Sequence, residues 1–303
     1  MRVLITGGAG FIGHHLAQAH LDRGDEVVVL DDLSTGRREN LPEGARLIEG
    51  DIREARRLLK GERDFDLLSH HAAQASVVVS VSDPVLDASV NILGGVEILH
   101  ALEGRVGSVL FASTGGAIYG EVPDAPAGEE SALCPASPYG AAKAAFEILL
   151  ASWSRRTGTP ATSLRYGNVY GPGQDPHGEA GVVAIFSQML NWGLTCTIFG
   201  DGSAQRDYIH VEDVVAANLA AIGNHGVFNI GTGRATTTRE IYDRLAGGDG
   251  TEPLFSPARD GELDRSVLDP ARALDVFGWS ALKGLAEGLA ETRAAFAQTK
   301  GGS

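Results

Sequence analysis

The first half of the chain alternates short runs of branched apolar residues with longer stretches in which apolar positions recur at helical spacing. Short β-rich runs separated by helical patterns are typical of a parallel sheet covered by helices. The pattern therefore predicts an α/β fold built on a doubly wound parallel sheet. The predicted strands are Arg2–Thr6, Glu26–Leu30, Arg46–Glu49, Leu67–His70, Ser108–Ala112 and Ala161–Arg165.

Three helices between these strands have recognisable faces or starts. The first is amphipathic, and the other two begin with Asp-Pro and Ser-Pro pairs that are typical of an N-cap followed by the first helical position. The predicted ranges are Phe11–Arg23, Pro84–Leu102 and Pro138–Ser154.

The rhythm changes after Tyr166, where loops rich in Gly, Pro, Asp and His replace the alternating pattern. A strand near Thr195–Phe199, a helix at Glu212–Ile222 and the strand-like VFNIGTG follow. A chain of 303 residues can hold one large domain or two modest ones. We predict a first domain over 1–166, to which parts of 207–245 return, and a smaller second domain over 167–303.

The composition of the chain disfavours several classes of function. A formal charge of −14 without a long run of Lys or Arg disfavours nucleic-acid binding. The longest charge-free stretch, Gly181–Gly200, contains several polar residues and is interpreted as a buried helix and strand rather than a membrane span. Cys134 and Cys196 stand far apart without further ligands at metal spacing, so no metal site is expected. With no secretory signal in the pattern, we expect a cytoplasmic enzyme or binding protein.

A glycine-rich loop follows the first predicted strand directly. Gly8, Gly10 and Gly13 fit G-x-G-x-x-G, Gly7 precedes them, and the first helix begins at Phe11. Such glycines allow a tight turn and a close backbone approach to a pyrophosphate, which binds at the helix N-terminus. With 40 glycines in the chain the pattern alone is weak, but the strand before it and the helix after it strengthen it. The loop therefore predicts a dinucleotide site.

Acidic residues follow the next two strands. Asp31 stands near the spacing at which a carboxylate accepts both ribose hydroxyls of a dinucleotide, and its charge would repel a 2′-phosphate. Asp32 could serve the same purpose, or either residue could belong to a surface turn. Asp51 precedes Ile52 after the third strand, where its carboxylate could meet the adenine or cap a helix. The pattern favours NAD over NADP.

Tyr139 and Lys143 are four residues apart in a predicted helix and therefore share one face. A tyrosine is a poor base at neutral pH, but a neighbouring ammonium stabilises the phenolate and lowers its pKa. Such a pair suits proton transfer from an alcohol that loses hydride. Because only 4 of the 25 basic residues are lysines, a lysine at position 143 favours a specific role over a casual surface position.

Hydroxyl groups follow the fifth predicted strand. Ser113 and Thr114 stand at its carboxyl end, the edge where ligands of such sheets bind. Turn chemistry would explain them equally well without Tyr139 and Lys143.

The chain resembles the extended short-chain dehydrogenases and, more narrowly, the UDP-glucose 4-epimerases. The resemblance spans roughly residues 1–266, with its motifs in family order. These motifs are TGGAGFIG, Asp31, GDI (50–52), HHAAQASV (70–77), ASTGGAIYG (112–120), SPYGAAK (137–143), RYGNVYGP (165–172), FGDGSAQRDYIHVEDV (199–214) and NIGTG (229–233).

The resemblance implies a Rossmann domain with a smaller C-terminal sugar-nucleotide domain, and a role for each matching residue. Tyr139 would be the acid/base, Lys143 its partner and Thr114 the hydroxyl that contacts the same sugar oxygen, with Ser113 as the alternative because the loop holds one extra residue. The implied NAD contacts are Gly7, Gly10, Phe11, Ile12, Gly13, Asp31, Asp32, Asp51, Ile52, Ala72, Tyr139, Lys143 and Tyr166. The implied contacts to a UDP-sugar are Asn168, Thr197, Phe199, Arg206, Arg259, Glu262 and Ser266.

The implied activity is inversion at C4 of a UDP-hexose through a 4-keto sugar, in a homodimer paired through the second and third predicted helices. A small residue at Ser266 would leave room for a 2-acetamido group. Dehydration and decarboxylation are disfavoured, because Gly115 and Gly116 stand where those enzymes carry acidic residues. UDP-glucuronate 4-epimerisation remains an alternative. An NAD sensor without catalysis is disfavoured by the intact Thr114, Tyr139 and Lys143.

Overall fold

The computed structural model describes residues 1–122, 126–177, 181–248, 252–258 and 263–298. Its contacts divide the chain into two compact units. Unit 1 comprises Met1–Thr114, Pro135–Arg165 and Val215–Phe228, and unit 2 comprises Gly115–Cys134, Tyr166–Val214 and Asn229–Ser303. The chain thus passes between the units several times, once next to the boundary expected at 166.

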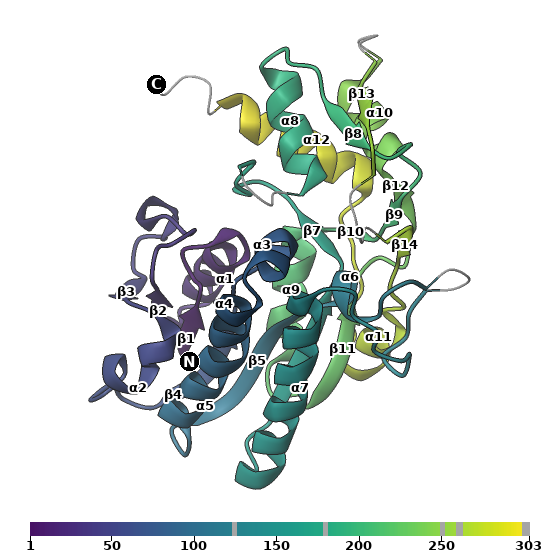
Figure 1. Cartoon of the computed structure of the whole chain (residues 1–303). Coiled ribbons are helices and arrows are strands. Elements are labelled where there is room, and N and C mark those ends of the chain that lie inside the picture. Colours follow the sequence, from purple (N-terminus) through teal and green to yellow (C-terminus); the bar gives the residue numbers. More distant parts are fainter. Residues whose placement is uncertain (123–125, 178–180, 249–251, 259–262, 299–303) are drawn as a thin grey trace. The chain divides into compact units, whose positions relative to one another are not determined.

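A seven-stranded sheet forms the centre of unit 1, in the order β11-β6-β5-β4-β1-β2-β3 (Figure 1). The pairs β1–β2, β1–β4, β2–β3 and β4–β5 are parallel. The doubly wound α/β class predicted from the sequence is confirmed. The strands are β1 (Arg2–Thr6), β2 (Glu26–Asp31), β3 (Arg46–Glu49), β4 (Phe65–His70), β5 (Val106–Thr114), β6 (Ala161–Tyr166) and β11 (Gly226–Ile230), with the last residues of β6 and β11 assigned to unit 2.

The helices of unit 1 begin where the sequence places capping residues. The Asp83 side chain accepts a hydrogen bond from the Leu86 amide, and the Ser137 hydroxyl oxygen accepts one from the Gly140 amide. The longer helical elements are α1 (Phe11–Asp22), α3 (Val77–Ser82), α4 (Pro84–Ala88), α5 (Gly95–Leu102) and α7 (Pro138–Thr157). Shorter ones are α2 (Ala55–Leu58), η1 (Arg38–Asn40) and η2 (Ile52–Glu54), and α9 (Val211–Ala221) crosses from unit 2 into unit 1.

The run predicted as one helix over Pro84–Leu102 contains a π-helical segment, η3 (Ser89–Gly94), between α4 and α5. A π-helical turn adds a residue to the helical repeat and shifts the side chains that follow it. Gly94 ends this segment and Gly95 begins α5, where a Cβ would overlap the Phe146 ring of α7. Close packing of the segment on α7 therefore requires glycine there.

The core of unit 1 lies between the sheet and its covering helices. In Figure 1, α4, α5 and α7 run beside one another along the strands. Full burial of such side chains contributes about 1.5–3 kcal/mol each. The cluster includes Leu4, Val28, Leu68, Val109 and Phe111 of the sheet with Ile98, Leu102, Phe146, Leu150 and Trp153 of the helices.

Unit 2 is built from short paired strands and helices. Its strands are β7 (Asn168–Tyr170) beside β10 (Tyr208–His210), β8 (Thr197–Phe199) beside β13 (Leu254–Ser256), and β9 (Gln205–Arg206) between β12 (Thr236–Thr237) and β14 (Arg265–Ser266). Its remaining helices are α6 (Gly115–Ile118), α8 (Val182–Asn191), α10 (Thr238–Ala246), α11 (Ala271–Phe277) and α12 (Leu285–Gln298). Buried side chains that include Phe186, Ile241 and Leu289 join α8, α10 and α12 into one core.

Candidate active site

The glycine loop joins β1 to α1 and has the tight backbone that a pyrophosphate site requires. Gly7 has a φ of +69°, and a Cβ there would lie 2.6 Å from the Ala72 amide nitrogen. A Cβ at Gly13 would overlap the Gly7 carbonyl oxygen. Gly10 is the N-cap of α1 and leaves that end without a side-chain cap. The loop therefore has the shape of a phosphate cradle at a helix N-terminus.

Asp31 ends β2 and is tied to this loop. Its Oδ2 accepts the Ala9 amide at 2.9 Å, and its Oδ1 accepts the Leu33 amide at 2.8 Å. Each carboxylate oxygen has a second lone pair that can still accept a ribose hydroxyl. Burial raises the pKa of Asp31. Asp32, by contrast, is exposed and accepts hydrogen bonds from Ser34, as a turn residue does.

The other residues predicted to contact NAD differ in their burial and in the partners that they already have. Asp51 caps η2 and binds the guanidinium of Arg53, so its carboxylate already has a local structural role. Ile52 is buried. Ala72 lies against the glycine loop, with its amide 3.2 Å from the Thr6 hydroxyl. Tyr166 is buried at the end of β6 and belongs to unit 2.

Thr114, Tyr139 and Lys143 come together within unit 1. Thr114 is the last residue of β5, and the other two lie on one face of α7. The Thr114 hydroxyl lies close enough to the Tyr139 phenol to lower its pKa by hydrogen bonding. The Lys143 ammonium is buried, donates to the Ala112 carbonyl at 2.9 Å and lies 5.9 Å from the centre of the Tyr139 ring. The strand end and the helix thus converge on one phenol.

The pKa of Tyr139 differs from the sequence-based expectation. Burial and, to a lesser extent, the charge of Asp87 raise it to about 12, while a hydrogen bond from Thr114 acts in the opposite direction. Lys143 donates to the backbone of β5 rather than to the phenol, and burial lowers its own pKa to about 8. In the protein alone, desolvation of the phenolate is therefore the largest influence on the pKa of Tyr139.

Ser113, the alternative to Thr114, points into a different network. Its hydroxyl donates to the Glu147 carboxylate, which also binds the Arg165 guanidinium. All three side chains are buried. This geometry favours Thr114 as the hydroxyl that faces Tyr139.

Residues predicted to bind the sugar nucleotide lie in unit 2. Arg206 in β9 and Ser266 in β14 are partners in the strand register. Ser266 is buried, and its hydroxyl donates to the Gly116 carbonyl at 3.4 Å. Asn168 begins β7, while Thr197 and Phe199 bound β8. Arg259 and Glu262 lie outside the described residues.

Asp207 organises this part of unit 2, a role that the motif did not reveal. Its buried carboxylate accepts the amides of Thr232, Gly233 and Leu268 and the Thr232 hydroxyl. Burial raises the pKa of Asp207, and these hydrogen bonds oppose that shift. The aspartate therefore fixes the NIGTG loop next to the strand that carries Arg206.

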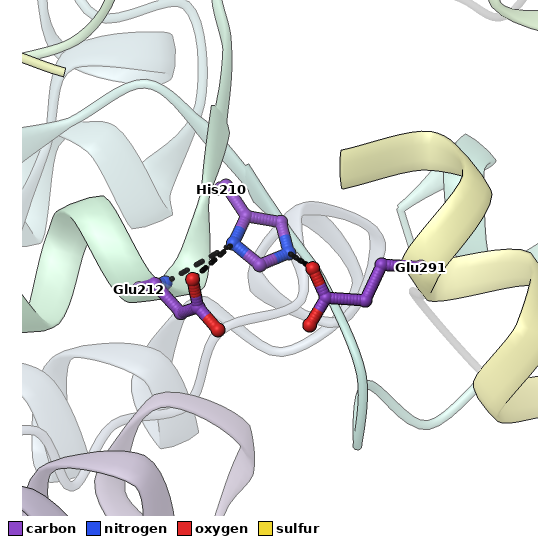
Figure 2. Close-up of side chains that lie close together, drawn as sticks. All are labelled: His210, Glu212 and Glu291. Atoms are coloured by element: carbon purple, nitrogen blue, oxygen red, sulfur yellow. Dashed lines mark hydrogen bonds and ion pairs between the residues drawn. The ribbon is translucent and has the colours of Figure 1, made fainter. Parts of the chain in front are cut away.

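Sequence reasoning also missed a cluster around His210 of β10. Figure 2 shows its Nδ1 facing Glu212 and its Nε2 facing Glu291 of α12, at 3.9 and 4.0 Å from the carboxylate oxygens. Histidine and carboxylates at this spacing could hold a metal ion. The Lys283 ammonium, however, lies 2.9 Å from Glu212 and 3.0 Å from Glu291. A positive charge from the chain itself thus already neutralises the two carboxylates.

Comparison with known proteins places this geometry in context. The model of the "NAD dependent epimerase/dehydratase family" matches residues 3–231. A protein named UDP-glucose 4-epimerase from Mycolicibacterium smegmatis is 46% identical over 96% of this chain and 97% of its own length.

Two solved structures share both fold and sequence with the chain. The UDP-glucose 4-epimerase of Thermotoga maritima with UDP-glucose has a TM-score of 0.95 and 44% identity, over 99% of this chain and all of that one. The UDP-glucose 4-epimerase of Thermus thermophilus in complex with NAD has a TM-score of 0.93 and 47% identity over the full length of both chains.

Proposed function

The chain belongs to the NAD dependent epimerase/dehydratase family, and on that premise we propose that it is an NAD-dependent isomerase that interconverts UDP-glucose and UDP-galactose by inversion at C4. The observation that carries the proposal is the convergence of Thr114, Tyr139 and Lys143 in a chain similar over its full length to UDP-glucose 4-epimerases. Gly115 and Gly116, in place of acidic residues, favour epimerisation over dehydration.

The residues of unit 1 fit the proposed proton transfer. NAD supplies the acceptor and donor of the C4 hydride and, when oxidised, a positive charge. Tyr139 takes the proton of the 4-hydroxyl as C4 is oxidised and returns it when C4 is reduced on the opposite face. Thr114 orients the phenol, and Lys143 provides an ammonium on the same helix face. No net proton has to leave the site.

A panel of UDP-glucose, UDP-galactose, UDP-N-acetylglucosamine, UDP-glucuronate and dTDP-glucose, scored for inversion at C4, tests this function. We expect UDP-glucose and UDP-galactose to interconvert. Inversion of UDP-glucuronate alone would favour the uronate epimerase. Loss of water from dTDP-glucose without inversion of UDP-glucose would overturn the proposal.

We expect NAD to remain bound through purification, since the proposed reaction regenerates it at each turnover. Denatured protein should release about one equivalent of NAD per chain, measured by chromatography. Asp31→Asn should lower the NAD content because it removes the buried charge beside the glycine loop, whereas Asp32→Asn should not. Recovery of NADP instead of NAD would argue against the role of Asp31.

We further propose a homodimer, because unit 1 presents an apolar face on adjacent helices. Exposed or half-buried apolar residues on α7 recur at i, i+4, i+7 and i+8, a spacing that lines one face of a helix. The run 84–102 beside α7 is long and apolar enough to cross a membrane by length and composition alone, a property that the core helices of soluble proteins share. The positions are Ala141, Ala145, Ile148 and Leu149 on α7 and Val85, Leu93 and Val96 on the neighbouring run.

Light scattering at micromolar concentration should give twice the chain mass. Ile148→Arg, at a position 66% exposed, should shift the protein to monomer, because a charge would be buried in the proposed interface. Leu274→Arg in α11, at 53% exposure, is the matched control and should leave the mass unchanged. A wild-type monomer would contradict the proposal.

A further inference from the structure

A buried carboxylate that forms no ion pair within 4 Å in the described part of the chain lies on α4, which packs against the helix that carries Tyr139 and Lys143. Asp87 in α4 is 1% exposed. Its Oδ1 accepts hydrogen bonds from the Gln74 amide at 2.7 Å and the Asn91 amide at 3.0 Å. Its Oδ2 is buried without a hydrogen-bond partner. Within the described part of the chain, no Arg or Lys nitrogen forms an ion pair with Asp87.

The partners of Asp87 are fixed by their other contacts. The Gln74 amide nitrogen also donates to the Ser76 carbonyl, and its oxygen accepts the Ser76 amide. The Asn91 amide also donates to the Gln74 carbonyl at 2.8 Å. Both side chains must therefore present their nitrogens to Asp87. Because amides are neutral, they orient the carboxylate without cancelling its charge, and an uncompensated buried charge is costly.

Helix α7, which packs against α4, carries the cation that acts on this carboxylate. Burial raises the pKa of Asp87, and the charge of Lys143 opposes that shift. Lys143 on α7 is 3% exposed, and its ammonium donates to a backbone carbonyl rather than to a carboxylate. Asp87 and Glu147 both stabilise its charged form. Glu147, however, is already paired with Arg165. Asp87 is thus the carboxylate whose negative charge is left to stabilise the Lys143 ammonium.

The other charged or titratable groups facing this pair do not replace that interaction. His70 and His71 lie close enough for Lys143 to affect them, but burial lowers the pKa of each to about 3, so they are neutral near pH 7. Tyr139 is a neutral phenol at that pH, since its pKa is about 12.

We propose that Asp87 is the buried counter-ion of Lys143 and a positioning residue for the proposed epimerase. The charge of Asp87 keeps Lys143 in its ammonium form and sets the pH range in which Tyr139 and Lys143 work together. The inference rests on the proposed function for its kinetic test. It assigns Asp87 no contact with substrate or cofactor. It also explains why a carboxylate stays in the core although a neutral side chain would avoid the cost of burial.

The test is the pH profile of kcat for wild type and Asp87→Asn. Removing a negative charge lowers the pKa of every group that it reaches, and Asp87 raises the pKa of both Tyr139 and Lys143. Both the acidic and the basic limb of the bell-shaped profile should therefore move to lower pH, by about one unit for the loss of a buried charge. Asp87→Glu keeps the charge and should return the limbs towards the wild-type pH.

Glu97→Gln is the control, because Glu97 in α5 pairs with the exposed Arg56. Its profile should match that of the wild type. A lower kcat in Asp87→Asn with both limbs in place would show a structural role only and would overturn the inference. Movement of the limbs to higher pH would also overturn it.

A stability cycle tests the pair without activity. Melting temperatures of Asp87→Asn, Lys143→Gln and the double variant should be non-additive, with the double losing less than the sum, because each single variant leaves one buried charge alone. Additive losses would overturn the inference. If Asp87→Asn alone does not fold, the double variant should fold again, and a double variant that also fails to fold would overturn the inference as well. A wild type that inverts no UDP-sugar would refute the proposed function, while the cycle would still decide the role of Asp87.

Discussion

Tyr139→Phe is expected to lower kcat by about 10²–10⁴-fold, the usual contribution of a general acid–base group. The substitution removes one hydroxyl and leaves the ring on α7. Thr114 loses its hydrogen-bond partner, while Lys143 keeps its bond to the Ala112 carbonyl. Fold and bound NAD should therefore be retained, which circular dichroism and NAD release would establish. The residual rate should also lose the pH dependence that comes from the phenol.

Two variants separate chemistry from packing. Thr114→Val removes a hydrogen bond but keeps the phenol, so kcat should fall less than in Tyr139→Phe. Tyr119→Phe removes a buried hydroxyl that donates to Asn229 at 2.7 Å. Its cost should be about 1 kcal/mol of unfolding free energy, with little change in kcat. A near-normal rate in Tyr139→Phe would rule out the proton-transfer mechanism.

The central strands of unit 1 were predictable because they are buried on both faces. Such strands form nearly continuous apolar runs, and the predicted Arg2–Thr6 matches β1 residue for residue. The predicted Arg46–Glu49 also matches β3, although the residues of that strand are exposed or half-buried. Others differ by a few residues at the ends, as with β5, which extends to Thr114. The glycine loop was equally accessible, since its requirements are local and recorded in adjacent residues.

The strands of unit 2 were less predictable for a physical reason. β9, β12 and β14 have two residues each, too few for a period of two to be recognised. The segments next to them are held by distant partners, such as the Asp207 carboxylate that binds the amides of Thr232, Gly233 and Leu268. A single aspartate in a sequence carries no mark of that role.

Asp87 and the π-helical segment η3 were hidden for a related reason. A lone carboxylate at a helical position is usually solvated, and nothing near Asp87 in the sequence indicates that α7 covers it. His210 and Glu291 likewise meet only because α12 packs against β10. A local pattern predicted the helical run that carries Asp87, but only the tertiary structure reveals which charges face one another.

Ser266→Tyr is expected to suppress epimerisation of UDP-N-acetylglucosamine selectively. In the epimerases that the chain resembles, a small residue at this position leaves room for a 2-acetamido group. Ser266 is buried in β14, in register with Arg206, and its hydroxyl donates to the Gly116 carbonyl two residues after Thr114. A tyrosine there would fill the room that the small serine side chain leaves at this buried position.

We therefore expect the wild type to invert UDP-N-acetylglucosamine at a rate comparable to that for UDP-glucose. Ser266→Tyr should lower kcat/KM for the acetamido sugar by about 10–100-fold more than for UDP-glucose, which is the usual effect of overpacking a pocket. Ser266→Ala removes the hydroxyl without adding bulk and should keep both activities. Melting temperatures of the two variants separate lost stability from lost specificity. Equal losses on both sugars in Ser266→Tyr would place Ser266 outside the acetamido pocket. A wild type active on UDP-glucose but inert towards UDP-N-acetylglucosamine would rule out the open pocket itself.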